Sequence, residues 1–461
     1  MTRTLIQGGT VLTLDREVGD FERGDVLIEG EEILAVGTDL PAENAEVIDA
    51  SRAIVLPGFV DTHRHTWQAQ LRSIACDWTL GQYMTGLHAG LSGHFRPEDT
   101  YLGNLLGTVE ALDGGITTLL DWSHNLATPE HADAAIAGLI ESGSRAVFAH
   151  GGGAPQWDVF PNEVPHPDDA RRVRDQYFAS DDGLVTMAMA LRGPEVATRE
   201  TTVGDYALAR ELDLRITVHV GNGEMAKDRP VAWLNESGLM GPDVTYVHCN
   251  SISDEELRMV ADSGGTASVS PDIELQMGHG WPATGRLLKV GIRPTISIDV
   301  CSSNGGHMFG SMRALIGTQR GFDHADAGAR GEPLDHVPLT CREVVEFATI
   351  DGARALGLDE RIGTLTPGKQ ADVILLSTDA YGMFPVNNPY GMVVYNAHPG
   401  VVDTILVGGQ VVKRDGELLG PDRERLRRLA DESRDYLFEQ ARASAATAEA
   451  AIGGGWMPPH F

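Results

Sequence analysis

Eight short apolar segments recur between residues 59 and 300, each followed by a polar stretch and a helical pattern. Near-continuous apolar strands that alternate with amphipathic helices indicate parallel strands buried on both faces. Eight such strands predict an α/β fold of the (β/α)8 TIM barrel type. An open doubly wound sheet is the alternative, but polar residues close the segments at their carboxyl ends, where barrels carry their active sites. The segments are FVDTHRH, GITTLLDW, SRAVFAHGG, GLVTMAMALRG, LRITVHVGN, VTYVHCNS, GTASVSP and IRPTISIDV.

Both ends of the chain show a different pattern, in which apolar and polar residues alternate between turn-forming Gly and Asp. This pattern indicates short strands. We therefore expect a small β-sandwich domain built from both chain ends, residues 1–58 and 363–416, beside a barrel of residues 59–362. Residues 417–461 are predicted to form a helical tail. One face of that helix carries Leu426, Leu429, Ser433, Leu437 and Ala441.

The chain is strongly acidic, with 36 basic and 66 acidic side chains and a formal net charge of −30. A field of that sign repels phosphate backbones and anionic membrane surfaces, so we expect neither a nucleic acid nor a membrane as partner. No segment approaches the roughly 18 apolar residues of a membrane span, and the first residues lack the apolar core of a signal peptide.

The four cysteines are far apart and show no CxxC spacing. They argue against a disulfide framework and against a zinc-finger site. We therefore expect a cytoplasmic protein in a reducing compartment. Large barrel enzymes are commonly homo-oligomers, so a dimer or tetramer is expected, with a closed dimer as the default.

Metal-ligand residue types lie at the ends of four apolar segments. In DTHRH, alternation along the strand places His63 and His65 on one face. His219, His248 and Asp299 close the fifth, sixth and eighth segments. Each residue alone is also explained by a buried, hydrogen-bonded polar group, or for Asp299 by a helix N-cap. Because all of them point to one barrel mouth, the set indicates a bound divalent ion.

With these motifs the chain resembles the amidohydrolase superfamily, in the branch of cytosine deaminase-like, S-adenosylhomocysteine deaminase-like and triazine hydrolase-like enzymes. The resemblance extends over essentially the whole chain up to about residue 416, and its motifs are specific. The matching stretches are LPGFVDTHRHTWQAQLR, ALDGGITTLLD, VHCNSISDEEL, ISIDVCSS and GTLTPGKQADVILL.

The resemblance implies one metal ion, zinc in preference to iron, bound by His63, His65, His219 and Asp299. It also implies that His248 stays off the metal and hydrogen-bonds the attacking water or the substrate, while Asp299 additionally moves a proton. Binuclear relatives bridge two metals with a carboxylated lysine on the fourth strand. The segment GLVTMAMALRG contains no lysine, so a mononuclear site is expected.

One position departs from the family pattern. The deaminase branch usually carries His-x-x-Glu on the fifth strand, and that Glu donates a proton to the substrate ring. This chain has Asn222 three residues after His219, and an amide does not exchange protons at neutral pH. Glu224 is either a substitute or a solvated loop carboxylate. The departure weakens the expectation of deamination without excluding it, and favours a substrate whose leaving group is less demanding or which His248 can protonate.

Other substrate-binding candidates follow the predicted strands. Arg192 would clamp a substrate carboxylate or form a surface salt bridge. His279 lies in a loop that covers the substrate in the family, which makes it a stronger candidate than His88, His94 or His166. Tryptophans near the barrel mouth suit a flat substrate, or simply pack loops onto the barrel. The complete set of candidates is Asn222, Glu224, Arg192, His279, Trp78, His124, Gln68 and Ser302.

These features predict a metal-dependent hydrolase of a non-peptide carbon–nitrogen bond in a small nitrogenous compound, cyclic or heteroaromatic. Metal-bound hydroxide would attack, with His248 and Asp299 as catalytic residues. The first alternative is an aminohydrolase of a purine, pyrimidine, pterin or triazine-like ring. The second is a non-catalytic barrel that serves as a binding or assembly module, which the intact ligand set disfavours.

Overall fold

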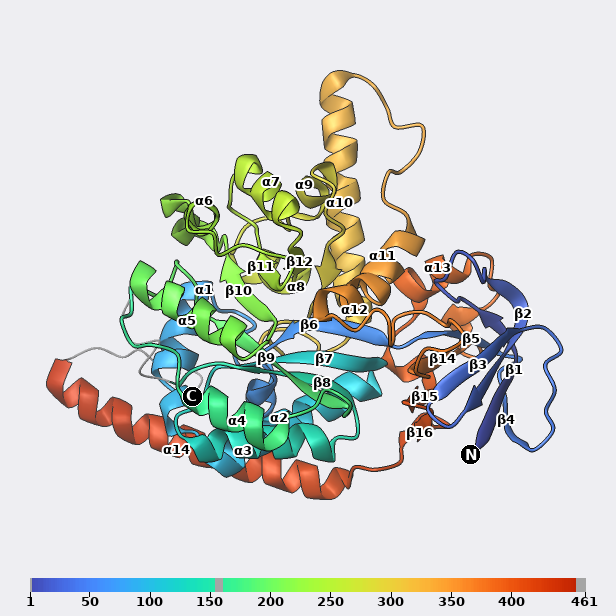
Figure 1. Ribbon diagram of the computed structural model, residues 1–461, viewed down its shortest axis with the longest axis horizontal. Coiled ribbons are helices and arrows are strands. Elements are labelled where there is room, and N and C mark those ends of the chain that lie inside the picture. The colour runs from blue at the N-terminus through green and yellow to red at the C-terminus, as the bar shows by residue number, and fades with distance from the viewer. Residues whose placement is uncertain (1, 154–160, 453–461) are drawn as a thin grey trace.

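The computed structural model describes residues 2–153 and 161–452, except for the side chains of Glu224 and residues 445–452. Eight parallel strands follow one another in chain order around a nearly closed barrel (Figure 1), which confirms the predicted fold class. These strands are β6 (Phe59–Arg64), β7 (Ile116–Ser123), β8 (Arg145–His150), β9 (Val185–Leu191), β10 (Ile216–Val220), β11 (Val244–His248), β12 (Thr266–Val269) and β13 (Thr295–Ile296).

The barrel closes between its first and last strands at the residues that the sequence analysis singled out. Arg64 and Asp299 form a parallel bridge. The backbone N–H of His65 donates to the carbonyl of Asp299 at 2.7 Å, and that of Asp299 donates to the carbonyl of His63 at 2.9 Å. The seam of the barrel therefore fixes the backbone of three predicted metal ligands relative to one another.

Helices cover the outside of the barrel, and several begin with a capping box, as at Ser253–Glu256 and Thr340–Glu343. The long helix α10 projects beyond the rest of the molecule (Figure 1). The α-helices up to residue 391 are α1 (Leu80–Tyr83), α2 (Pro97–Asp113), α3 (Pro129–Glu141), α4 (Asp169–Tyr177), α5 (Arg199–Glu211), α6 (Pro230–Glu236), α7 (Asp254–Ser263), α8 (Pro271–Met277), α9 (Thr284–Lys289), α10 (Met308–Arg330), α11 (Cys341–Phe347), α12 (Ile350–Leu356) and α13 (Pro389–Gly391). Short 3-10 or π turns are η1 (Thr66–Leu71), η2 (Met84–Ala89), η3 (Ser92–His94), η5 (Gly223–Asp228), η6 (Tyr381–Met383), η7 (Met392–Asn396) and η8 (Pro399–Val401).

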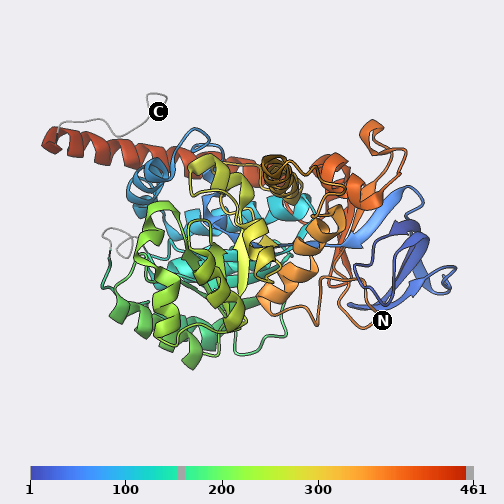
Figure 2. The same ribbon diagram turned by 90° about the horizontal axis from the view of Figure 1, so that it is seen from above.

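Strands from both chain ends form one mixed sheet of nine strands at one end of the molecule (Figure 2). The two ends meet where β14 pairs antiparallel with β5, which confirms a small domain contributed by both ends. The predicted boundary at residues 58 and 59 falls between β5 and β6. The strands are β1 (Arg3–Val11), β2 (Phe21–Glu29), β3 (Glu32–Gly37), β4 (Ala45–Asp49), β5 (Ala53–Pro57), β14 (Val373–Ser377), β15 (Val402–Val407), β16 (Gln410–Arg414) and β17 (Glu417–Leu418).

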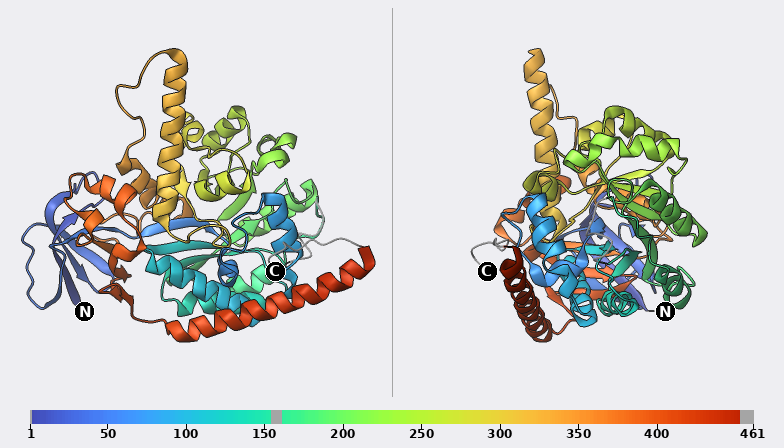
Figure 3. Two further views of the ribbon diagram at one scale, coloured as in Figure 1. Left: turned by 180° about the vertical axis from the view of Figure 1, so that it is seen from behind. Right: turned by 90° about the vertical axis from the view of Figure 1, so that its left-hand side faces the viewer.

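The last element of the described residues is the long helix α14 (Arg423–Ile452), which lies along the outside of the barrel (Figure 3); residues 453–461 of the predicted tail lie outside the described residues. Leu437 and Ala441 are 0% and 2% exposed and belong to one apolar cluster with Tyr83, Met277 and Val300. The Ser433 hydroxyl donates to Asp99 at 2.7 Å. The part of α14 that carries Ser433, Leu437 and Ala441 is therefore packed into the folded core.

The lumen of the barrel is more polar than near-continuous apolar strands would suggest. Hydroxyl groups of Thr62, Ser268, Thr295 and Ser297 are buried and hydrogen-bond one another at 2.6–2.9 Å. Because they satisfy each other, they are buried without the cost of unpaired polar groups. None of the described helices combines the length and apolar character that crossing a membrane requires.

Candidate metal centre and active-site cavity

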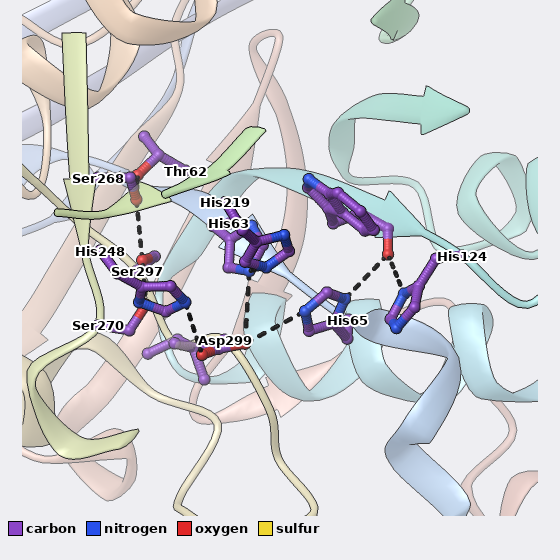
Figure 4. A network of polar contacts seen from close by, with 12 residues as sticks. Thr62, His63, His65, His124, His219, His248, Ser268, Ser270, Ser297 and Asp299 are labelled. Atoms are coloured by element: carbon purple, nitrogen blue, oxygen red, sulfur yellow. Dashed lines mark hydrogen bonds and ion pairs between the residues drawn. The ribbon is translucent and has the colours of Figure 1, made fainter. Parts of the chain in front are cut away.

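Three imidazoles and one carboxylate converge at the carboxyl end of the barrel strands (Figure 4). Nε2 of His63 lies 3.2 Å from Nε2 of His219. Oδ1 of Asp299 lies 3.4 Å from Nε2 of His63 and 3.3 Å from Nε2 of His65. His248 stands on the other side of the carboxylate, with Nε2 3.7 Å from Oδ2 of Asp299.

The local backbone at two of these positions is unusual. His248, the last residue of β11, and Asp299, three residues after β13, have φ angles of +76° and +65°. This left-handed region is uncommon for residues other than glycine, and occupying it costs about 1–3 kcal/mol per residue. The surrounding barrel therefore maintains a strained backbone conformation at both residues, whose side chains approach each other to 3.7 Å.

The pKa shifts of the clustered histidines and of Asp299 favour the protonation states that bind a cation. Burial lowers the pKa of His63, and it holds the pKa values of His65 and His219 well below the ordinary histidine value. Burial opposes ionisation of Asp299, but the hydrogen bond and positive field of His63 bring its pKa well below the ordinary value. Neutral imidazoles and an ionised carboxylate are the forms that bind a divalent ion.

The second nitrogen of His65 fixes its orientation. Nδ1 lies 3.1 Å from the backbone carbonyl of Trp122, to which it donates. Nε2 is then unprotonated and faces Asp299. A ligand histidine whose other nitrogen donates to a carbonyl is a common arrangement in metal sites. Ligand atoms of His63, His65 and Asp299 lie close enough together to hold a metal ion, and so do those of His63, His219 and His248.

His248 hydrogen-bonds through Nδ1 to a glutamate that the sequence analysis did not single out. Nδ1 of His248 lies 3.2 Å from Oε1 of Glu274, and the same oxygen accepts the backbone N–H of Ser270 at 2.8 Å. Glu274 is 0% exposed. Burial lowers the pKa of His248, but the hydrogen bond to Glu274 and the charge of Asp299 outweigh it and raise that pKa. His248 therefore differs electrostatically from the other cluster histidines and is suited to carry a proton.

A second buried carboxyl, that of Glu195, supports the turn that carries Asn222. Its Oε1 accepts the backbone N–H of Gly221 at 2.6 Å, while Oε2 is buried without a partner. Burial raises the pKa of Glu195 to about 7. Glu195 is not among the residues that line the cavity described below; it contacts the backbone next to Asn222.

A cavity opens beside the cluster and holds about 120 Å³, many times the roughly 10–15 Å³ that one water needs. Of the predicted site residues, the described cavity wall contains His65, His124, His219, Asn222, His248, His279 and Asp299. It also contains Tyr83 and His88, although the sequence analysis ranked His88 below His279. Residues 65–96, which bring Tyr83 and His88 to the cavity, show no strand or helix periodicity that would have revealed them.

Other predicted residues lie away from the cavity or behind its wall. Gln68 donates to the hydroxyl of Tyr83 at 2.5 Å and accepts from Ser302 at 2.8 Å, so these two residues support Tyr83. Trp78 is buried in the apolar cluster that includes Tyr83. Arg192 is not among the lining residues, because its guanidinium is bonded to Asn162, the carbonyl of Val164 and Asp205. The side chain of Glu224 lies outside the described residues.

The chain is also similar to known proteins in sequence and in fold. Residues 54–412 match the family model described as Amidohydrolase family. The 5-methylthioadenosine/S-adenosylhomocysteine deaminase of Symbiobacterium thermophilum is 30% identical over 433 residues, which are 90% of this chain and 94% of that protein.

Two solved structures share the fold. An adenosine deaminase from Xanthomonas campestris with bound zinc has 24% identity and a TM-score of 0.80, over 95% of this chain and 99% of that one. The atrazine chlorohydrolase TrzN from Arthrobacter aurescens TC1, complexed with zinc, has 24% identity and a TM-score of 0.82, over 94% and 100%. At this level of identity the two likenesses concern the fold.

Proposed function

The chain belongs to the amidohydrolase family, and we propose that it hydrolyses a non-peptide carbon–nitrogen bond of a small nitrogenous ring compound, with one zinc ion at His63, His65, His219 and Asp299. The observation that carries this proposal is the convergence of three imidazole nitrogens and one carboxylate beside a ligand-sized cavity. An intact donor set of this kind is not expected of a barrel that serves only for binding or assembly.

A bound divalent ion supplies a nucleophile at neutral pH, because it lowers the pKa of water to roughly 7. In the proposed reaction, water oxygen bonds to the ring carbon, the carbon–nitrogen bond breaks, and the departing nitrogen takes up the proton that water releases. We propose Asp299 and His248 as the groups that transfer this proton. His248, held through Nδ1 by Glu274, presents Nε2 to Asp299 and to the cavity and is placed to pass the proton on.

Deamination is the second candidate within the same chemistry, since the curated relative from Symbiobacterium thermophilum is named as a deaminase. Asn222 weighs against it, because an amide cannot donate the proton that the Glu of the deaminase branch gives to the substrate ring. Asn222→Glu restores the His-x-x-Glu pattern. If the missing acid is what limits deamination, this variant gains ammonia release from aminopyrimidines and aminopurines. Efficient ammonia release by the unmodified protein would instead show that Asn222 does not prevent deamination.

Two substitutions distinguish residues that bind the metal from residues that act only in catalysis. We expect His63→Ala to lose zinc and activity together, and His248→Ala to lose activity while it keeps most of the zinc. Metal analysis of the purified proteins alongside turnover checks both. Equal zinc loss in the two variants would make His248 a ligand, and wild-type protein that cannot be reconstituted with any transition metal would refute the enzyme proposal.

We also propose a cytoplasmic homo-oligomer, a dimer or a tetramer. The four cysteines Cys76, Cys249, Cys301 and Cys341 are all free thiols in the structure, which is compatible with a reducing compartment. Light scattering on the purified protein measures its mass directly, and a monomer at micromolar concentration would contradict the oligomer.

A further inference from the structure

More metal-ligand residues meet at the mouth of the barrel than the proposed zinc ion uses. Among the described residues, His248, His279 and Asp299 form a further group whose ligand atoms all lie within 4.8 Å of one another, and all three residues are buried. They come from the end of β11, from the loop between α8 and α9, and from the residues after β13. His248 lies on the side of Asp299 opposite to His65 (Figure 4). The group therefore adjoins the first metal site and shares only Asp299 with its proposed ligands.

The carboxylate of Asp299 offers one oxygen to each group. Oδ1 lies 3.4 Å from Nε2 of His63 and 3.3 Å from Nε2 of His65, whereas Oδ2 lies 3.7 Å from Nε2 of His248. A tetrahedral zinc ion binds nitrogen and oxygen at about 2.0–2.2 Å and so holds its ligand atoms roughly 3.3–3.6 Å apart. The spacing between His248 and Asp299 is close to this value. Oδ2 is therefore placed to bind a second ion while Oδ1 binds the first.

His248 has the hydrogen bond that prepares a histidine for a metal. Its Nδ1 donates to Oε1 of the buried Glu274 at 3.2 Å, which directs Nε2 toward Asp299. A carboxylate that accepts from the far nitrogen of an imidazole fixes the ring and strengthens it as a ligand. The same contact that orients His248 for proton transfer therefore also suits it to bind zinc.

His279 indicates that a ligand is missing. It is 4% exposed, and neither of its ring nitrogens has a hydrogen-bond partner among the described residues. Its ring stands edge-on to that of His248, with the centroids 4.8 Å apart. Its backbone is held in place, because its carbonyl accepts from the N–H of Gly223 at 3.1 Å and from the hydroxyl of Ser251 at 3.3 Å. Buried polar atoms are nearly always bonded, and next to His248 and Asp299 a metal ion would bond one of them.

We propose that His248, His279 and Asp299 form a second, weaker zinc site that fills when zinc is in excess and inhibits the enzyme. This inference rests on the proposed hydrolysis and its first zinc ion. The second site is weaker because it has three protein ligands instead of four and shares Asp299 with an ion of the same charge. It inhibits because it occupies Nε2 of His248, the atom assigned to proton transfer. It needs no carboxylated lysine, unlike the site of the binuclear relatives.

The test titrates the full chain, already loaded with one zinc ion, with zinc chloride alone by calorimetry. One further ion should bind, with a Kd at least about 100-fold higher than that of the first. If no further ion binds at millimolar zinc, the inference is overturned.

His279→Ala distinguishes this site from zinc held loosely on the acidic surface. The variant should keep the first ion and bind the second about 100-fold more weakly or worse, since losing a residue that merely orients a ligand already costs about 10- to 100-fold. His88→Ala is the matched control, because His88 is buried in the same cavity wall but belongs to none of the candidate metal groups among the described residues. It should bind both ions as the wild type does. A second ion bound equally well by His279→Ala would be adventitious and would overturn the inference.

Turnover separates the second site from the proposed function. Hydrolysis of cytosine, adenine and N-ethylmelamine, followed as ammonia or ethylamine release, should fall about 100-fold or more as the second ion binds, because proton transfer through His248 is blocked. Turnover that persists with the second site full overturns the inhibition. Turnover without any second binding event leaves the proposed function standing and overturns the inference. A second ion that binds at His279, with no probe hydrolysed by the one-zinc protein, supports the site and counts against the proposed function alone.

Discussion

Glu274 shows how one buried side chain determines the behaviour of another. Its carboxylate accepts from Nδ1 of His248 and from the backbone of Ser270, so the ring orientation and tautomer of His248 depend on it. We expect Glu274→Gln to lower kcat by about 10- to 100-fold, the usual effect of removing a group that orients a site histidine. KM and zinc content should change little, because Glu274 does not line the cavity.

Glu256→Gln is the control for that prediction. Glu256 is as deeply buried, at 1% exposed, but it caps α7 through Ser253 instead of contacting His248. A wild-type pH–rate profile in the Glu274→Gln variant, with kcat reduced no more than in Glu256→Gln, would show that Glu274 is only structural.

The raised pKa of Glu195 predicts that the free energy of unfolding depends on pH. Its pKa in the folded protein, about 7, lies above the ordinary 4.5, so the folded state keeps this proton when the unfolded state has lost it. This group therefore costs stability progressively as pH rises from about 4.5 to about 7, by ~3 kcal/mol in total. Glu195→Gln removes that cost, because the amide oxygen still accepts from Gly221.

Urea denaturation of both proteins between pH 5 and 8 with excess zinc, at steps of about one unit, checks this sign. The variant should match or fall below the wild type at the acidic end and exceed it at the alkaline end. Parallel curves would show that Glu195 does not titrate in this range.

At this residue scale, the sequence was informative where residue type and strand position coincide. His63, His65, His219, His248 and Asp299 stand out because each polar residue ends an apolar run. Glu274 and Glu195 do not stand out, because a glutamate in a short helix or loop looks like any surface carboxylate. Their importance comes from burial against His248 and Gly221, a tertiary property that neither spacing nor composition reports.

Among the secondary-structure elements, the eight barrel strands were predictable and the walls of the cavity were not. A parallel strand buried on both faces leaves a near-continuous apolar run in the sequence. The turn η2, by contrast, contributes Met84 and His88 to the cavity, and MTGLHA has no strong periodicity. The hydroxyls of Thr62 and Ser297 were likewise unrecognised, because a single small polar residue barely interrupts an apolar run.

A buried ion pair connects strand β8 of the barrel to the small domain. Arg145 and Asp372 are 2% and 4% exposed and make two hydrogen bonds, at 2.9 and 3.1 Å. Asp372→Ala leaves the guanidinium buried without its counter-charge, which should cost about 3–5 kcal/mol of unfolding free energy. Urea denaturation measures this cost. Asp379→Ala removes the exposed partner of Arg52 and should change stability little; equal effects of the two variants would refute the argument.

At the scale of the whole molecule, the tail helix α14 completes the core on the outside of the cavity wall. Leu437 is fully buried in the cluster that includes Tyr83, Met277 and Val300, all three of which line the cavity. Leu437→Ala should lower stability by about 2–5 kcal/mol, the usual cost of such a truncation. It should also weaken ligand binding, because the wall loses its support.

Thermal unfolding and calorimetric titration with a bound ring compound check the two effects. Leu419→Ala, which truncates a leucine 60% exposed, is the matched control and should leave both measurements unchanged. A Leu437→Ala variant that is less stable but binds with wild-type affinity would show that the packing of α14 does not affect ligand binding in the cavity.

The shared cluster also has a consequence that runs in the opposite direction. If the packing of α14 strengthens ligand binding by some factor, thermodynamic reciprocity requires that ligand binding strengthen the packing of α14 by the same factor. Occupancy of the active site would then slow amide hydrogen exchange and protease cleavage near Leu437. Hydrogen exchange in α14 would thus show whether a ligand is bound in the active-site cavity.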